Sequence, residues 1–162
     1  MTAGHPRILA LGLGNDILGD DAVGLLAVRR LRVLLPVSVE VVEATGAGLD
    51  LLDLLEGYDK ALILDAIMTG KHPAGTILEF SADDFRKENV RSPHYAGLPT
   101  VLQLAESLSI MFPQHIHIVA IEVENPYEVR EGLSARAESA IPAMVARAEG
   151  IVQTWLSDPS SG

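Results

Sequence analysis

Short apolar runs alternate with stretches of helical periodicity along most of the chain. The run at residues 8–13, Ile-Leu-Ala-Leu-Gly-Leu, has no polar alternation, which is typical of a strand buried on both faces of a sheet. From Asp21 onward the apolar positions follow a helical period instead. The same criteria predict further strands at residues 39–43, 60–65, 76–80 and 116–123, and further helices at residues 49–55, 98–108 and 141–155.

This order of strands and helices predicts an α/β fold with βαβ units and a mostly parallel sheet covered by helices on both faces. The segment 76–80 alternates only weakly, as an edge strand does, and residues 81–97 are polar and irregular. A length of 162 residues fits one domain, since domains average about 150 residues. We therefore expect a single three-layer domain over residues 1–157 and a disordered tail at residues 158–162.

The amino-acid composition excludes several classes of protein. The chain has 12 Lys or Arg against 22 Asp or Glu, and the net charge of −10 argues against binding to a nucleic-acid backbone. It has no cysteine, which excludes disulfides, cysteine nucleophiles, thiolate zinc sites and iron–sulfur ligation. No signal peptide is recognisable, and no apolar stretch reaches the roughly 18 residues that a membrane span needs. We expect a cytoplasmic protein with no nucleic-acid or membrane partner.

The glycine-rich turn after the first strand resembles a dinucleotide-binding loop only superficially. The fingerprint needs a third glycine three positions after Gly14, where this chain has Ile17. Asp16, Asp20 and Asp21 would also repel phosphate groups. A nucleotide-binding regulator is therefore disfavoured. A serine hydrolase is disfavoured as well, because the chain has no Gly-x-Ser-x-Gly nucleophile elbow.

Carboxylates and histidine remain as the candidate chemical groups. Ligands of parallel α/β sheets bind beyond the carboxyl ends of the strands. Asp21 begins a predicted helix after the first strand, Asp65 ends the strand at residues 60–65, and His94 follows Pro93 in the irregular segment. If the three converge, they form a nitrogen-and-carboxylate set suited to a divalent metal. Without thiolates or a second imidazole, such a set should bind metal loosely, as a recognition site.

Each of these residues also has a structural interpretation. Asp21 at a helix start can cap that helix, and Asp65 at a strand end can accept hydrogen bonds from loop amides. His94 can be an ordinary loop histidine. His115 and His117, two residues apart at a strand start, can chelate a metal or simply pack on one face of the sheet.

Three blocks of sequence resemble a known family. Residues 8–15, followed by Leu18 and by Asp-Asp-Ala-Val-Gly at residues 20–24, resemble the opening signature of the hydrogenase maturation proteases. Residues 63–66, Ile-Leu-Asp-Ala, resemble the central strand of that family, and Ser-Pro-His at residues 92–94 resembles its histidine loop. The family consists of endopeptidases that trim the C-terminus of the large subunit of [NiFe] hydrogenases.

The resemblance implies an α/β fold with a twisted central sheet, and it implies residue roles. Asp21, Asp65 and His94 would engage the nickel already inserted into the large-subunit precursor, so that only the loaded precursor is cut; other divalent metals could occupy the same site. Asp21 stands where the family often has glutamate. The sequence leaves open whether the metal acts as a Lewis acid or Asp21 or Asp65 acts as a general base.

The segment after the second strand departs from the family pattern of an acid followed by Gly-Gly-Thr. Here Glu43 precedes Ala-Thr-Gly, so the roles of Glu43 and of Asp16 in the first loop stay open. The alternative to an endopeptidase is a maturation chaperone that binds a metal or the precursor without cutting it. We expect a monomer that binds its precursor transiently.

Overall fold

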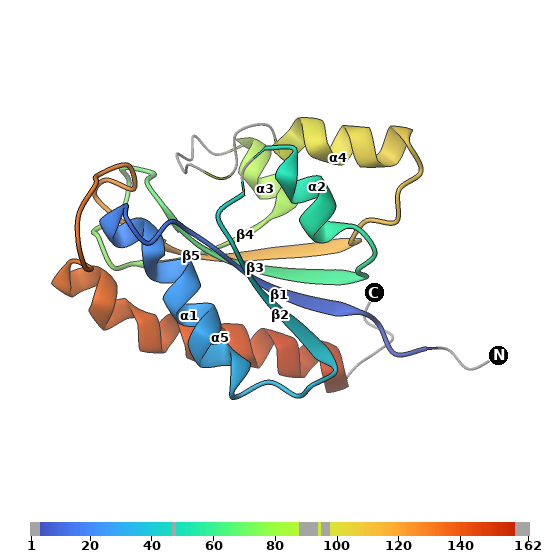
Figure 1. Ribbon diagram of the computed structural model, residues 1–162, viewed down its shortest axis with the longest axis horizontal. Helices are drawn as coiled ribbons and strands as arrows, with labels where there is room; N and C mark the ends of the chain where they lie inside the picture. Colours follow the sequence, from blue (N-terminus) through green and yellow to red (C-terminus); the bar gives the residue numbers. More distant parts are fainter. Residues whose placement is uncertain (1–3, 47, 88–93, 95–97, 158–162) are drawn as a thin grey trace.

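The computed structural model describes residues 4–46, 48–87, 94 and 98–157 (Figure 1). Its elements alternate between strand and helix, as the sequence predicts. They are β1 (Ile8–Leu13), the 3-10 turn η1 (Gly19–Ala22), α1 (Val23–Arg32), β2 (Val39–Ala44), α2 (Asp50–Leu55), β3 (Lys60–Ile67), β4 (Ile77–Ser81), α3 (Ala82–Lys87), α4 (Leu98–Ser107), β5 (His115–Glu122) and α5 (Ala135–Ser157). The tail predicted at residues 158–162 lies outside the described residues.

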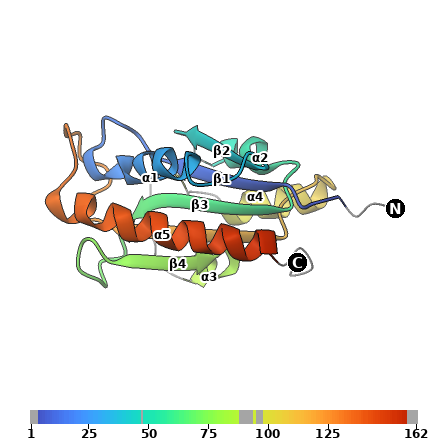
Figure 2. The same cartoon turned by 90° about the horizontal axis from the view of Figure 1, so that it is seen from below.

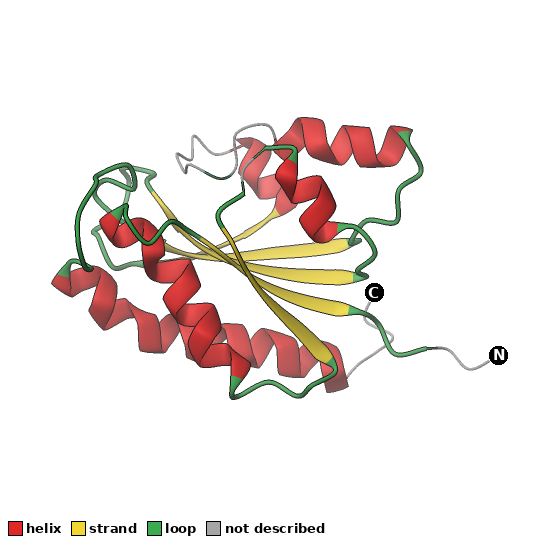
Figure 3. Cartoon of the chain, viewed as in Figure 1, coloured by secondary structure: helices red, strands yellow, loops and turns green. Residues whose placement is uncertain are grey.

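The five strands form one twisted sheet in the order β2-β1-β3-β5-β4 (Figure 3). The pairs β1–β2, β1–β3 and β3–β5 are parallel, and β4 alone is antiparallel, on the edge beside β5. The prediction of a mostly parallel sheet with an edge strand at residues 76–80 is therefore confirmed.

Helices cover both faces of the sheet and give three layers. Figures 1 and 2 show α1 and α5 on one face and α2, α3 and α4 on the other. Along β1, alternate residues enter two separate cores: Ile8 and Ala10 pack toward α1 and α5, whereas Leu9 and Leu11 pack toward α2 and α4. Each fully buried Leu or Ile contributes about 1.5–3 kcal/mol, which explains why the first strand is apolar throughout. Among the described residues, no helix is both long and apolar enough to cross a bilayer.

The predicted end of the strand at residues 60–65 is wrong, and the difference has a physical reason. β3 does not end at Asp65, because β5 stays paired with it as far as Ile67 opposite Glu122. The neighbour on the other side stops earlier: β1 pairs with β3 only as far as Gly12 opposite Leu64. Asp65 therefore lies inside a strand, one residue beyond the point where its partner on one side ends.

The segment 81–97 is not irregular throughout, because α3 occupies its beginning. Ser81 and Asp84 cap this helix reciprocally: the Asp84 amide donates to Ser81 Oγ (3.2 Å), and the Ser81 amide donates to Asp84 Oδ2 (3.0 Å). This reciprocal pair of hydrogen bonds is a capping box. It allows a helix to begin in a polar segment that has no apolar stripe. Residues 88–93 and 95–97, which include part of the histidine block, lie outside the described residues.

Candidate functional site

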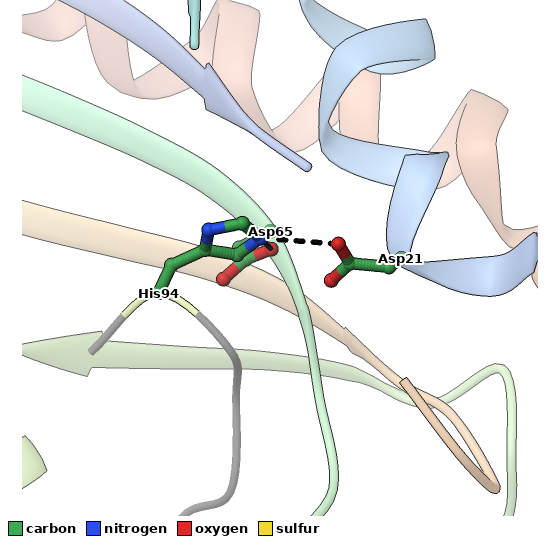
Figure 4. A group of neighbouring side chains, drawn as sticks. All are labelled: Asp21, Asp65 and His94. Carbon is green, nitrogen blue, oxygen red and sulfur yellow. Dashed lines mark hydrogen bonds and ion pairs between the residues drawn. The ribbon is translucent and has the colours of Figure 1, made fainter. Parts of the chain in front are cut away.

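Three side chains that are far apart in the sequence meet at the carboxyl edge of the sheet. Asp21 comes from η1, Asp65 from β3, and His94 from the connection between α3 and α4 (Figure 4). His94 Nε2 lies 3.1 Å from Asp21 Oδ2 and 3.9 Å from Asp65 Oδ1. The structure thus brings together the three residues singled out in the sequence.

The cluster is closed off from solvent. Asp21 and Asp65 are 0% exposed and His94 is 2% exposed. One ligand atom from each residue lies within 4.8 Å of the others, a spacing that a single ion could bridge. Two carboxylates and an imidazole form a donor set that suits a divalent transition metal.

One atom of the cluster gives an independent indication of a missing ligand. Asp21 Oδ1 is buried and has no hydrogen-bond partner among the residues that the structure describes. A buried carboxylate oxygen without a partner is costly, so native proteins rarely leave one in that state. A cation held between Asp21 and His94, together with a water bound beside it, would satisfy this oxygen.

One backbone carbonyl, that of Gly46, sets the orientation of the imidazole. His94 Nδ1 lies 3.1 Å from the Gly46 carbonyl oxygen, which can only accept, so Nδ1 carries a hydrogen and donates it. Nε2 then points toward Asp21 and Asp65, which is the arrangement that second-shell contacts impose on metal-binding histidines. The Gly48 amide also donates to the His94 carbonyl at 3.4 Å. The loop after β2 therefore holds the histidine in place.

The two carboxylates change the protonation of His94. Burial lowers the pKa of His94, but the hydrogen bond to Asp21 and the negative charges of Asp65 and Asp21 outweigh it and raise the pKa from 6.5 to about 9. Without a metal the imidazole is therefore a cation at neutral pH, and it balances part of the carboxylate charge. A metal ion would take over that role by displacing the proton on Nε2.

The capping interpretation of Asp21 is wrong. Ala22 is the residue that precedes α1, and no side chain in the described part of the chain caps that helix. Asp65 Oδ1 accepts a hydrogen bond from the Ala66 amide at 2.8 Å, but Ala66 belongs to β3 and not to a loop, so this contact is not the loop-amide bond that the structural interpretation of Asp65 expects. The same oxygen also faces His94, so this hydrogen bond to the amide fixes the carboxylate beside the imidazole.

Sequence reasoning missed the role of the residue next to Asp21. The Asp20 carboxylate accepts from the Ser134 amide and from Ser134 Oγ, both at 2.7 Å. Ser134 Oγ accepts in turn from the Ala137 amide at the start of α5. Asp20 thus joins η1 to α5 across 114 positions of sequence. Such a long-range pair leaves no local signal.

Glu43 and Asp16 lie outside the cluster, in an ion-pair network on α1. Arg29 Nε donates to Glu43 Oε1 at 2.8 Å, and the same guanidinium lies 3.4 Å from Asp16 Oδ2. Arg32 adds a longer contact of 3.7 Å to Glu43. The network joins the end of β2 to α1 and to the first loop.

The remaining histidines with a proposed role do not join the cluster. His115 is exposed at the start of β5, and His117 Nε2 lies 2.8 Å from Glu79 Oε1. Glu79 also accepts from Arg147 at 2.8 Å, so His117 belongs to a contact between β4, β5 and α5.

The fold and the site define the class: an α/β protein with a buried Asp-Asp-His cluster, a candidate metal site, at the carboxyl edge of its sheet. Comparison with known families shows which family of α/β proteins this is. Residues 26–151 match the family model described as hydrogenase maturation protease. The chain belongs to this family and is a maturation peptidase.

Individual relatives agree with this assignment. The chain is 35% identical over 143 residues to the hydrogenase 2 maturation protease of Escherichia coli K12, covering 85% of this chain and 86% of that protein. The structure matches the hydrogenase maturating endopeptidase HybD of E. coli with a TM-score of 0.78 and 30% identity over 91% of this chain and 93% of the other. It matches the [NiFe] hydrogenase maturation protease HybD of Thermococcus kodakarensis with a TM-score of 0.71 and 27% identity, over 90% and 98% of the two chains.

Proposed function

We propose that the protein removes a C-terminal peptide from the large-subunit precursor of a [NiFe] hydrogenase, and that the nickel already inserted into this precursor is the recognition element. Asp21, Asp65 and His94 are the groups that engage that nickel. The observation that carries the proposal is the buried cluster, in which Asp21 Oδ1 has no hydrogen-bond partner among the described residues. The names of the relatives, hydrogenase 2 maturation protease and [NiFe] hydrogenase maturation protease, support the choice of substrate.

The chemistry of the cluster is consistent with a nickel gate, in which only precursor that already carries nickel is cut. A metal held by two carboxylates and one imidazole is bound loosely, and it can arrive and leave with the precursor. An apo precursor would bring no cation to offset the carboxylate charge, so His94 would keep its proton and the peptide would not be positioned. Loaded precursor would displace that proton and place its scissile segment beside the carboxylates.

Hydrolysis then needs an activated water. Asp21, Asp65 and His94 would hold the nickel of the precursor, which would supply Lewis-acid chemistry at the scissile carbonyl or the attacking water. Asp21 Oδ2, 3.1 Å from His94 Nε2, would hold the nickel, and Oδ1 would act as the base, because it accepts no hydrogen bond from the described residues while Asp65 Oδ1 accepts from Ala66. Asp21 would take the proton of the water as its oxygen attacks the carbonyl carbon. The proton would pass to the departing amine as the C–N bond breaks.

Intact-mass spectrometry of the precursor tests the proposal. Nickel-loaded precursor and a nickel-free control are each incubated with the protein, which we expect to act as a monomer in the cytoplasm. Loss of a C-terminal peptide from the loaded sample alone would support both the activity and the gate. Cleavage of both samples would refute the nickel requirement. An unchanged mass in both samples, with the cognate precursor, would favour the binding chaperone instead.

A further inference from the structure

Two loops next to the cluster are joined by backbone hydrogen bonds into one unit. Leu18 in the loop after β1 forms a parallel bridge with Arg130, in the connection between β5 and α5. The Gly19 amide donates to the Arg130 carbonyl, and the Arg130 amide donates to the Ile17 carbonyl, both at 3.1 Å. The Asp20–Ser134 contact adds a side-chain tie at the base of the same unit. Figure 1 shows both loops, in blue and orange, at the same end of the sheet.

This paired-loop unit, made of the loops around Leu18 and Arg130, carries exposed apolar side chains on both loops. Ile17 is 64% exposed, Val129 is 76% exposed and Tyr127 is 51% exposed. Ile17 and Val129 each lie next to one member of the bridged pair, so the bridge brings them side by side. A group of large exposed apolar residues on a fixed backbone is a feature of interaction surfaces.

The unit is continuous with the candidate active site. The Asp21 amide donates to the Leu18 carbonyl at 3.0 Å, so the bridged residue Leu18 directly supports the turn that carries Asp21. A protein whose peptide bond is brought to Asp21 would therefore approach the cluster beside this surface. A second copy of the chain has no such reason to bind here.

The charge of the paired-loop unit indicates what kind of partner surface it would bind. Glu128 and Glu131 flank Val129 and Arg130, and all of these side chains are exposed. Glu124 adds a further exposed carboxylate on the same connection. The acidic side chains outnumber the one arginine, so the surface is complementary to an apolar patch bordered by Lys or Arg.

We infer that the paired-loop unit, through Ile17, Tyr127 and Val129, is the docking surface for the folded body of the precursor subunit, around the segment that is cut. This inference rests on the proposed function and adds a second recognition element to it. The Asp21–Asp65–His94 cluster would recognise the nickel in the precursor, and the paired-loop unit would bind the folded part of the precursor. Because backbone hydrogen bonds fix the loops in advance, docking costs little ordering entropy.

A double substitution on the surface tests the inference, with a matched control on the same protein. Ile17→Ser with Val129→Ser removes two exposed side chains and leaves the backbone bridge intact. Val33→Ser with Val37→Ser is the control, because these residues are also exposed (84% and 107%) and lie beyond the opposite end of α1. Both variants should keep the wild-type Tm.

We expect the loop variant to raise KM for nickel-loaded precursor about tenfold or more, the range of interface hot spots, with little change in kcat. The control should leave both constants unchanged. An unchanged KM in the loop variant would overturn the inference, and so would an equal rise in the control. A fall in kcat at constant KM would also overturn it, because the loops would then act on the chemistry.

A binding measurement separates this inference from the proposed function. The Asp65→Asn protein and its Ile17→Ser/Val129→Ser derivative are compared for the Kd of nickel-loaded precursor, so that cleavage plays no part. A weaker complex with the derivative supports the docking surface even if wild-type protein does not cut the precursor. Equal Kd values, or no complex with either protein, overturn it even where wild-type protein does cut.

Discussion

His94 Nε2 lies 3.1 Å from Asp21 Oδ2, and this contact joins residues 73 positions apart in the chain. It connects the turn after β1 with the segment between α3 and α4, and both residues are almost fully buried. A buried imidazole beside two carboxylates has two stable states. It either carries a proton or shares the carboxylates with a metal.

The protonated state makes the stability of metal-free protein depend on pH. The pKa of His94 is raised to about 9 in the folded chain, above 6.5. The folded state therefore holds the proton more tightly, and its stabilisation is complete below about pH 6.5 and is lost as pH rises through about 9. The upper limit of the effect is about 3 kcal/mol.

Urea unfolding with a chelator present measures this effect. The difference in unfolding free energy between wild type and His94→Gln should shrink between pH 6 and pH 9.5. His115→Gln, which replaces an exposed histidine outside the cluster, is the matched control for the substitution itself. A His94→Gln difference that grows with pH would contradict the assignment of a proton to the cluster.

Removal of either partner of the cluster should separate folding from processing. Asp65→Asn keeps the shape of the side chain and its hydrogen bond to Ala66, but it removes the charge that faces His94. His94→Ala removes the imidazole altogether. We expect both proteins to fold and to leave nickel-loaded precursor uncut, as judged by circular dichroism and by intact mass. Full processing by either variant would remove that residue from the proposed site, and His115→Ala is the control that should process normally.

Substitution of the adjacent aspartates Asp20 and Asp21 on η1 should have different effects on processing and on Ni²⁺ binding. Asp21→Asn should lower kcat/KM for the precursor about 100-fold or more, because it removes the carboxylate proposed both as the base and as a nickel ligand. In calorimetry we expect the free wild-type protein to bind Ni²⁺ weakly and the Asp21→Asn protein not to bind it.

Asp20→Asn is the matched comparison, one residue away. It weakens the two hydrogen bonds from Ser134 and should cost about 1–3 kcal/mol of stability, while Ni²⁺ binding is retained. Equal loss of Ni²⁺ binding in the two variants would mean that the charge of the whole turn, and not Asp21 itself, holds the ion.

The sequence predicts most of the fold because its strands are strongly patterned. The all-apolar run of β1 and the helical stripe of α5 have periods that leave little choice of element. The helix α3 was missed because it has no apolar stripe, although Ser81 and Asp84 carry a capping-box signal at the right spacing. The extension of β3 past Asp65 was missed because pairing with β5, a non-local contact, decides where the strand ends.

The cluster was predicted from strand ends and from the family resemblance, while its surroundings were not. The Gly46 carbonyl that orients His94 is a backbone atom, and its contact depends on the path of the loop rather than on a side chain. The Asp20–Ser134 tie and the Leu18–Arg130 bridge each join segments more than 100 positions apart. Only the folded chain shows that these contacts support Asp21.

Two glycines in helices give the last prediction, because their surroundings are opposite. A Cβ on Gly24 in α1 would lie 2.3 Å from the carbonyl oxygens of Leu13 and Leu64, so α1 rests directly on the backbone of β1 and β3. A Cβ on Gly150 in α5 would meet no atom of another part of the described chain within 4 Å. Alanine is favoured over glycine in a helix by about 1 kcal/mol, which is the whole effect expected at an open position.

Gly150→Ala should therefore raise the free energy of unfolding by up to about 1 kcal/mol. Gly24→Ala should lower it by about 2 kcal/mol or more, because the clash with two carbonyls exceeds the gain in helix propensity. It should also reduce processing, since a displaced α1 carries Asp21 away from His94. Urea unfolding and the precursor assay measure both effects. Equal stabilisation by the two substitutions would show that α1 does not approach the sheet as closely as these contacts require.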